Sequence, residues 1–141
     1  MGTQTWKVIV KQNYAVLYDE AWHTPIVCIE QLAVDDLNKN VGDETARFYT
    51  DGALDFNVSP QGFPRMKPPM DAGRLAARAN NVNSEAAFAE TFSTVNVVPM
   101  DPLVNRGIWC KIEKNARRLV SKWNDVIILS GPIYNFNSAN D

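Results

Sequence analysis

The stretch STVNVVPMDPLVNRGIWCKIEKNARRLVSKW, residues 93–123, contains the two elements around which the rest of the chain is expected to fold. Its first six residues, 93–98, are rich in β-branched side chains and predict a strand. Pro99 and Pro102 then interrupt the strand and lead into a helix over about residues 103–122, the longest that the sequence predicts.

Two sides of this predicted helix differ in character. Apolar residues recur at steps of three and four, at Ile108, Ile112, Ala116, Leu119, Val120 and Trp123. A second stripe, at steps of four, consists of Asn105, Trp109, Glu113 and Arg117. Because a helix has about 3.6 residues per turn, this stripe lies opposite much of the apolar side. Its spacing alone fits either a solvated face with a Glu113–Arg117 ion pair or a polar functional site.

The segments on both sides of this stretch predict a single α+β domain over residues 1–141, built on a largely antiparallel sheet. Ser84 is a good N-cap for a short helix over residues 85–92. Residues 35–69 are loop-like and too long for a simple connection, which is typical of functional loops. Further strands are predicted for residues 6–10, 14–18, 26–30 and 125–130.

The composition is that of a globular domain, with 45% hydrophobic and 21% charged residues. The net charge of −2 does not by itself indicate a nucleic-acid-binding protein. Its distribution is uneven, however: residues 65–122 hold ten Lys or Arg against five Asp or Glu, whereas the rest of the chain is acidic. A basic half beside an acidic half fits a site that meets polyanions on one face, although chance segregation on a solvated surface gives the same pattern.

Several classes of protein are excluded or disfavoured. No apolar run approaches the ~20 residues that a membrane span needs, so we expect no membrane association. The N-terminus lacks a basic segment followed by an apolar one, and we therefore expect an intracellular protein without a secretory signal. Cys28 and Cys110 form neither a metal motif nor a disulfide framework and are expected to be reduced.

Beyond these patterns, three segments resemble the DNA/RNA non-specific endonuclease family, which is endonuclease G-like and has a ββα-metal, or His-Me, finger. The segments are MDAGRLAARANN (70–81), residues 92–120 and DVIILSGPIY (125–134). The most specific part is the spacing N-x-x-P-x-x-x-x-L/V-N-x-G-x-W-x-x-x-E-x-x-x-R, which is matched by Asn96, Pro99, Val104, Asn105, Gly107, Trp109, Glu113 and Arg117.

The resemblance implies roles for these residues. Asn105 would bind a single catalytic Mg²⁺, Glu113 would act near it through its water shell, and Arg117 would face the phosphate. Asn105 and Glu113 are eight residues apart, ~12 Å along a helix, so both cannot ligate one Mg²⁺ directly. Asp71, Asn96 and Trp109 are expected to support the site from behind, and nucleic acid is expected to contact Arg74, Arg78, Arg106 and Arg117.

The sequence departs from the family at its most important position. The family motif is Asp-Arg-Gly-His, in which the His is the general base, whereas this chain has Asp71, Ala72, Gly73 and Arg74. A guanidinium stays protonated at neutral pH and cannot accept a proton. Loss of a general base typically lowers the rate by ~10²–10⁴. The only histidine, His23, falls in a predicted turn and is expected to be an ordinary surface residue.

Three functions therefore stay open. The first is a divergent nuclease-like domain that binds nucleic acid, with or without Mg²⁺, and hydrolyses it weakly or not at all. The second is an active Mg²⁺-dependent endonuclease with a non-standard base. The third is a structural subunit of a larger assembly. Only seven residues follow Tyr134, so the domain is expected to be truncated relative to the family. Either it is a minimal version of the family, or a second copy or a protein partner completes it.

Overall fold

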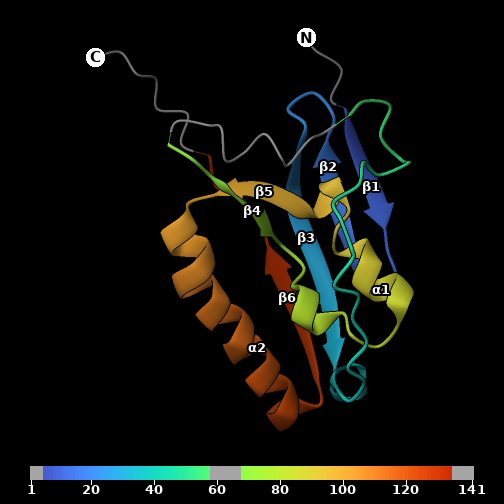
Figure 1. The fold of residues 1–141 in the computed structure, drawn as a ribbon, viewed down its shortest axis with the longest axis vertical. Helices are drawn as coiled ribbons and strands as arrows, with labels where there is room; N and C mark the ends of the chain where they lie inside the picture. Colours follow the sequence, from blue (N-terminus) through green and yellow to red (C-terminus); the bar gives the residue numbers. More distant parts are fainter. Residues whose placement is uncertain (1–4, 58–67, 135–141) are drawn as a thin grey trace.

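Four antiparallel strands form the main sheet of the computed structural model, which describes residues 5–57 and 68–134 (Figure 1). The strands lie in the order β1-β2-β3-β6. Their bounds are Trp6–Val10, Tyr14–Asp19, Thr24–Ala33 and Asp125–Ser130. This arrangement confirms the predicted α+β class and the antiparallel order of the first three strands.

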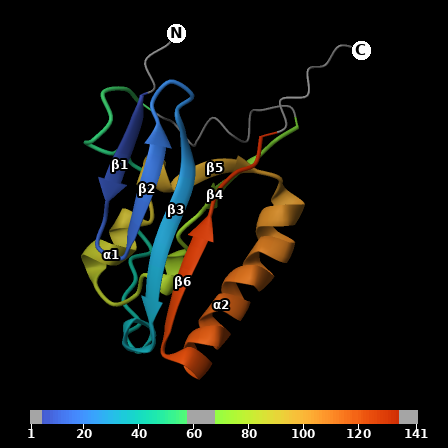
Figure 2. The same ribbon diagram turned by 180° about the vertical axis from the view of Figure 1, so that it is seen from behind.

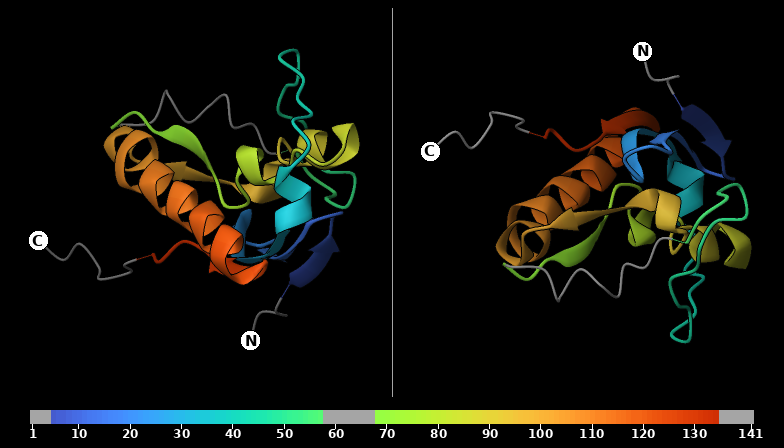
Figure 3. Two further views of the ribbon diagram at one scale, coloured as in Figure 1. Left: turned by 90° about the horizontal axis from the view of Figure 1, so that it is seen from below. Right: turned by 90° about the horizontal axis from the view of Figure 1, so that it is seen from above.

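A second layer covers one side of the main sheet (Figure 3). It contains the antiparallel pair β4 (Asp71–Arg74) and β5 (Val97–Met100) together with α1 (Glu85–Glu90) and α2 (Cys110–Trp123). Single 3-10 turns connect these elements. They are η1 (Val34–Leu37), η3 (Arg78–Asn80) and η4 (Thr94–Asn96).

The hydrophobic core fills the space between the two layers. Alternate residues of the strands point inward because successive side chains of a strand face opposite sides of the sheet. The buried cluster draws on β1, β2 and β3 and on the segments around β4 and β5; its members are Ile9, Tyr14, Val16, Tyr18, Cys28, Leu54, Leu75, Ala76, Val95 and Val98. Core contacts with the main sheet therefore fix the position of β4 and β5.

One sequence-based assignment in this second layer was wrong, and one strand was not predicted. The predicted strand over residues 93–98 begins as the 3-10 turn η4, and strand pairing starts only at Val97. The Asp-Ala-Gly-Arg tetrad, for which no secondary structure was predicted, forms β4 and pairs with β5. Gly73 permits this close pairing, because a Cβ at this position would lie 2.7 Å from the Cβ of Met100.

The long helix begins as a π-helix, η5 (Val104–Trp109), and continues as α2. The carboxylate of Asp101 accepts hydrogen bonds from the backbone N–H groups of Leu103 and Val104, at 2.8 and 3.3 Å, and so satisfies donors at the start of the helix. Asn124, with a φ of 66°, ends it in a left-handed conformation. A π-helix has more residues per turn than an α-helix, so two side chains four residues apart lie more nearly in line along its axis. This geometry aligns Asn105 with Trp109.

The orientation of this helix contradicts its amphipathic pattern. Of the predicted apolar side only Val120 is buried, and the exposed residues are Ile108, Ile112, Leu119 and Trp123. The polar stripe instead faces β4 and η3, as the contacts described below show. Hydrophobic periodicity predicts which side of a helix forms apolar contacts, but it does not identify the partner in those contacts. No element in the described part of this chain covers the apolar side of this helix.

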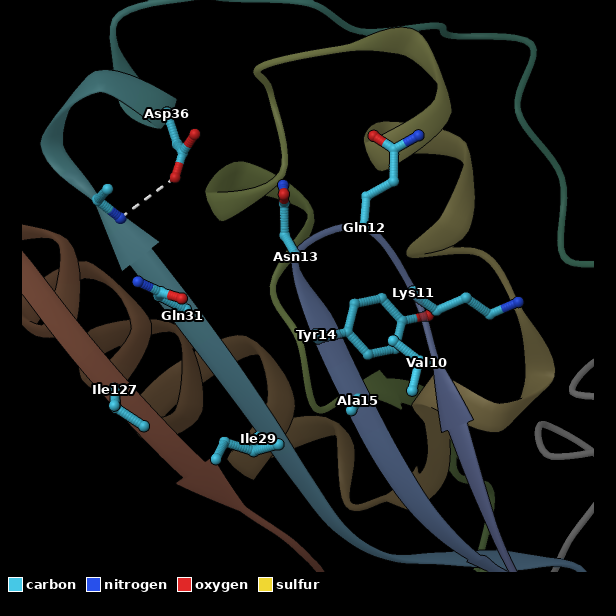
Figure 4. A pocket seen from close by; sticks show the side chains of 11 residues that line it. Val10, Lys11, Gln12, Asn13, Tyr14, Ala15, Ile29, Gln31, Asp36 and Ile127 are labelled. Atoms are coloured by element: carbon cyan, nitrogen blue, oxygen red, sulfur yellow. Dashed lines mark hydrogen bonds between the residues drawn. The ribbon is translucent and has the colours of Figure 1, made fainter.

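The outer face of the main sheet is also apolar and uncovered by the second layer (Figure 2). We call this the outer face and define it by Val8, Val10, Ile29, Ile127 and Leu129, which are exposed by 45–73%. Strand register places Ile29 directly opposite Leu129, so the face is continuous across β3 and β6. A hollow of about 480 Å³ lies on this face. Figure 4 shows the apolar side chains Val10, Ala15, Ile29 and Ile127 that line it.

The remaining predictions in the described chain have mixed outcomes. Ser84 caps α1 as expected, since its hydroxyl accepts the N–H of Ala87 at 3.1 Å. The predicted loop over residues 35–69 contains the end of η1, and its residues 58–67 lie outside the described residues. Among the residues described, we find no helix with the length and hydrophobicity required to traverse a bilayer.

Candidate functional site

A polar hollow of about 400 Å³ lies between β4, η3 and the long helix. It brings together six of the residues singled out from the sequence: Arg74, Arg78, Asn105, Arg106, Glu113 and Arg117. Ala72, Ala79 and Cys110 complete its wall. Four guanidinium groups and one carboxylate therefore line one cavity, which we call the arginine hollow.

The side chain of Arg74 is fixed by aromatic rings. Its guanidinium carbon lies 4.3 Å from the ring centre of Phe92 and 4.8 Å from that of Phe48. Its Nε donates a hydrogen bond to the carbonyl oxygen of Thr91 at 3.2 Å. Burial, with a contribution from neighbouring Arg78, lowers the pKa of Arg74 to about 10, while Glu113 raises it. The group therefore remains a cation at neutral pH.

Asp71 organises the entrance of the arginine hollow. Its carboxylate accepts two hydrogen bonds from Arg106, both at 2.8 Å, and one from the side-chain Nδ2 of Asn105 at 3.0 Å. The hydrogen bonds from Arg106 and then Asn105 hold the pKa of Asp71 below its usual value. Asp71 therefore forms its ion pair with Arg106.

This contact also decides which atom of Asn105 is free to ligate a cation. Because Nδ2 is engaged with Asp71, the oxygen Oδ1 is the atom left for a ligand. Glu113 lines the same hollow, but the four arginines oppose a divalent cation there. Among the described residues, no group of three or more His, Cys, Asp or Glu side chains could hold a metal.

Glu113 and Arg117 lie one turn apart on the same side of α2. Burial raises the pKa of Glu113, and the nearby cations of Arg117 and Arg74 oppose that rise. Arg117 donates a hydrogen bond from one terminal nitrogen to the Oδ1 of Asn80 at 2.8 Å. The polar stripe of the helix is thus tied to the body of the domain, which rules out the solvated-face interpretation.

Asn96 and Trp109 lie outside the hollow and hold its walls together. Asn96 is fully buried and exchanges hydrogen bonds with the backbone of Ala76, accepting at 2.7 Å and donating at 2.9 Å. The indole N–H of Trp109 donates to the carbonyl oxygen of Arg74 at 3.0 Å. Both contacts fix the backbone from which Arg74 projects. The catalytic and binding roles assigned from the sequence stay predictions.

No histidine lies in the arginine hollow. His23, the single histidine of the sequence, stacks on Phe56 with ring centres 3.8 Å apart and does not line the cavity. Cys28 and Cys110 are both free thiols. Cys28 is buried, whereas Cys110 is only partly buried and lines the hollow.

Several residues that shape the site were missed in the sequence. Phe48 lies in a predicted loop, and its contact with Arg74 is long-range, so no local pattern could reveal it. Glu30 gave a signal: it occupies an inward-facing position of an apolar strand, in phase with Cys28 and Leu32. A carboxylate in that phase indicates a buried polar network, because charged residues are rarely buried without partners.

Comparison with known proteins places these features in context. The family model described as DNA/RNA non-specific endonuclease matches residues 1–140. "Nuclease EXOG, mitochondrial" of Mus musculus is 30% identical over 140 residues, which cover 99% of this chain and 37% of that protein. "Endonuclease G, mitochondrial" of Homo sapiens is 27% identical over 124 residues, which cover 88% of this chain and 42% of that protein.

A solved structure extends the similarity to three dimensions. It is described as the crystal structure of the EndoG/EndoGI complex and matches with a TM-score of 0.80 at 26% identity. The match covers 91% of this chain and 54% of that chain. The present chain thus spans less than half of the length of the two curated relatives and about half of the solved one.

Proposed function

Because this chain belongs to the DNA/RNA non-specific endonuclease family, we propose that it is a nuclease-derived domain that binds nucleic acid and hydrolyses it weakly or not at all. The phosphate backbone would enter the arginine hollow. There Arg74, Arg78 and Arg117 would contact phosphate oxygens, while Arg106 would share its charge with Asp71. Guanidinium groups suit this task since their rigid fork of donors matches phosphate geometry.

One observation supports the expected loss of hydrolysis. At the position that the resemblance assigns to the family's general base, the chain holds the guanidinium of Arg74, which lies over the rings of Phe48 and Phe92 and donates a hydrogen bond to the carbonyl oxygen of Thr91. A group held this way cannot remove a proton from an attacking water at neutral pH. His23 stacks on Phe56 instead of lining the cavity and therefore supplies no substitute.

A divalent cation fits this site only in part. Asn105 would hold Mg²⁺ through Oδ1, and water would complete the shell, which Mg²⁺ accepts readily. The cation would polarise a phosphate oxygen. The surrounding guanidinium groups oppose it until the negative charge of the nucleic acid is present. We therefore expect weak Mg²⁺ binding by the free protein and stronger binding with nucleic acid present.

A restoration experiment tests the proposal. The double change Ala72→Arg with Arg74→His rebuilds the family motif, and we expect it to nick supercoiled plasmid with Mg²⁺ or Mn²⁺ in an EDTA-sensitive way. The unmodified chain is expected to shift nucleic acid in a gel, less as salt rises, without cutting it. Arg78→His is the matched control, because it places an imidazole elsewhere in the same hollow. Robust EDTA-sensitive cleavage by the unmodified chain would overturn the proposal.

A second candidate is an active nuclease that uses Glu113 as base. The observation in its favour is the partial burial of Glu113 in the hollow, which raises the pKa of a carboxyl beside Arg117 and Arg74. A base whose pKa is closer to neutral accepts a proton more readily. Under this reading the unmodified chain cleaves plasmid, and Glu113→Gln abolishes the cleavage while leaving nucleic-acid binding in place.

A third candidate is a structural subunit, which the outer face favours. An exposed patch that combines Val8, Val10, Ile29, Ile127 and Leu129 is typical of protein–protein contact rather than of a free surface. A chain with only this role would neither bind nor cut nucleic acid. It would instead elute as an assembly, and Leu129→Lys would disperse it in sedimentation experiments.

A further inference from the structure

Glu30 is a carboxylate buried beneath the arginine hollow. It lies on the inward face of β3, only 2% exposed, beside Tyr14 and Ile128 on the neighbouring strands. Its Oε1 accepts a hydrogen bond from the Nδ2 of Asn80, the backbone N–H of Ala77 adds a second favourable interaction with the carboxylate, and its Oε2 has no hydrogen-bond partner. Burying a carboxylate with an unsatisfied oxygen is costly, which suggests a role other than stability.

The hydrogen bonds around Glu30 form a chain that ends in the hollow. Glu30 holds the amide nitrogen of Asn80, which is itself 3% exposed on η3. The Oδ1 of Asn80 accepts from a terminal nitrogen of Arg117 at 2.8 Å. Arg117 in turn lines the arginine hollow. Three side chains on three separate elements thus connect the main sheet to a guanidinium of the site.

The chemistry of Glu30 determines how the side-chain amide of Asn80 is oriented between Glu30 and Arg117. An ionised carboxylate only accepts hydrogen bonds, whereas an asparagine amide both donates and accepts. In its ionised form Glu30 therefore requires the NH₂ of Asn80 to point toward it, and the carbonyl oxygen then points toward Arg117. The guanidinium of Arg117 only donates and favours the same amide orientation when Glu30 is protonated. The reverse amide orientation would set two acceptors against each other at Glu30 and two donors against each other at Arg117.

We propose that Glu30 is a positioning residue, which through Asn80 fixes the direction in which Arg117 presents its guanidinium to the arginine hollow. Its effect on nucleic acid rests on the function proposed above, but the positioning itself does not. Charged or titratable groups that face Glu30 are Cys28 on its own strand and Glu113 and Arg117 on α2. Among these, the chain of hydrogen bonds reaches only Arg117.

The first test reads the side chain of Arg117 directly and needs no nucleic acid. Glu30→Leu removes both acceptor oxygens without leaving a large cavity. We expect the Nε–Hε resonance of Arg117 in ¹⁵N-edited NMR spectra to shift and broaden in this variant. Glu30→Gln retains one acceptor oxygen and is expected to restore most of the wild-type signal. Glu85→Gln, which changes an exposed carboxylate on α1, is the matched control and is expected to leave the signal unchanged.

The second test asks whether Glu30 acts through Arg117. We expect Glu30→Leu to weaken the binding of a 20-nucleotide DNA about threefold, and Arg117→Met about tenfold, in line with the loss of one phosphate contact. In the Arg117→Met background, Glu30→Leu is expected to have no further effect. Where Glu30→Leu does not fold, Asn80→Ala breaks the same chain at its middle and takes its place in both tests.

The outcomes separate the two proposals. An unchanged Arg117 resonance in Glu30→Leu, or equal losses of affinity with and without Arg117, overturns the positioning role. Absence of nucleic-acid binding by the wild-type chain overturns the proposed function instead, and the NMR result still decides the role of Glu30. Restoration of the signal by Glu30→Gln supports the positioning role, because a residue needed only to fill volume would be replaced equally well by leucine.

Discussion

Replacing Glu30 by glutamine is expected to change how the stability of the protein depends on pH. Burial raises the pKa of Glu30 from 4.5 to about 7, against the opposing hydrogen bonds from Asn80 and Ala77. The folded state therefore holds the proton of Glu30 in a pH range where the unfolded state has lost it. Stability then falls as pH rises from 4.5 to about 7, because the unfolded chain binds fewer protons there.

The magnitude follows from the size of the shift. Each pKa unit corresponds to 1.36 kcal/mol, so ionising Glu30 in the folded state costs about 3 kcal/mol above pH 7. Below pH 4.5 this cost is absent, since Glu30 is then protonated in both states. Glutamine cannot ionise. The stability of Glu30→Gln relative to wild type should thus increase by about 3 kcal/mol between pH 4.5 and 8.

Urea unfolding followed by tryptophan fluorescence measures this difference. Both proteins are unfolded at several pH values from 4.5 to 8, and the free energies are obtained by linear extrapolation. Glu85→Gln removes an exposed carboxylate and is expected to give a difference from wild type that does not vary with pH. A difference for Glu30→Gln that is equally flat, or that decreases with pH, would refute the reasoning.

Three further predictions concern other parts of the fold. Gly131→Ala should destabilise the protein by about 1–3 kcal/mol in urea unfolding, because its Cβ would collide with the backbone oxygen of Ile26. Ser84→Ala should cost about 1 kcal/mol in the same assay by removing the N-cap of α1, whereas Ser84→Asp should retain it. Arg106→Ala should raise the pKa of Asp71 in a carboxyl-detected NMR titration, because Arg106 provides its main stabilising hydrogen bonds; an unchanged pKa would show that Asn105 suffices.

The sequence could predict the features that depend on residues close together in the chain. Strand periodicity located β1, β2, β3 and β6, and the spacing of Asn105, Glu113 and Arg117 placed them on one side of a helix that faces the hollow. The order of strands and helices supplied the α+β class, which the sheets of the structure and its solved neighbour confirm. The family resemblance supplied the family, which the match over residues 1–140 confirms.

What the sequence could not show depends on distant contacts. Asp71–Arg74 contains no β-branched residue, and its strand exists because β5 pairs with it. The aromatic surroundings of Arg74 combine Phe48 from a loop with Phe92, which lies two residues beyond the end of α1. The helix turns its apolar side outward because polar contacts from Trp109 and Arg117 fix the opposite side, a preference that periodicity alone cannot express.

The second layer, whose β4 and α2 line the arginine hollow, lies on the side of the main sheet opposite the outer face (Figures 2 and 3). Whatever molecule covers the apolar strands consequently leaves the guanidinium groups accessible. If several copies were joined through that side, a single polyanion would meet more than one cationic cavity at once. The second contact would then be intramolecular, and its avidity would depend on the spacing of the copies rather than on any new bond.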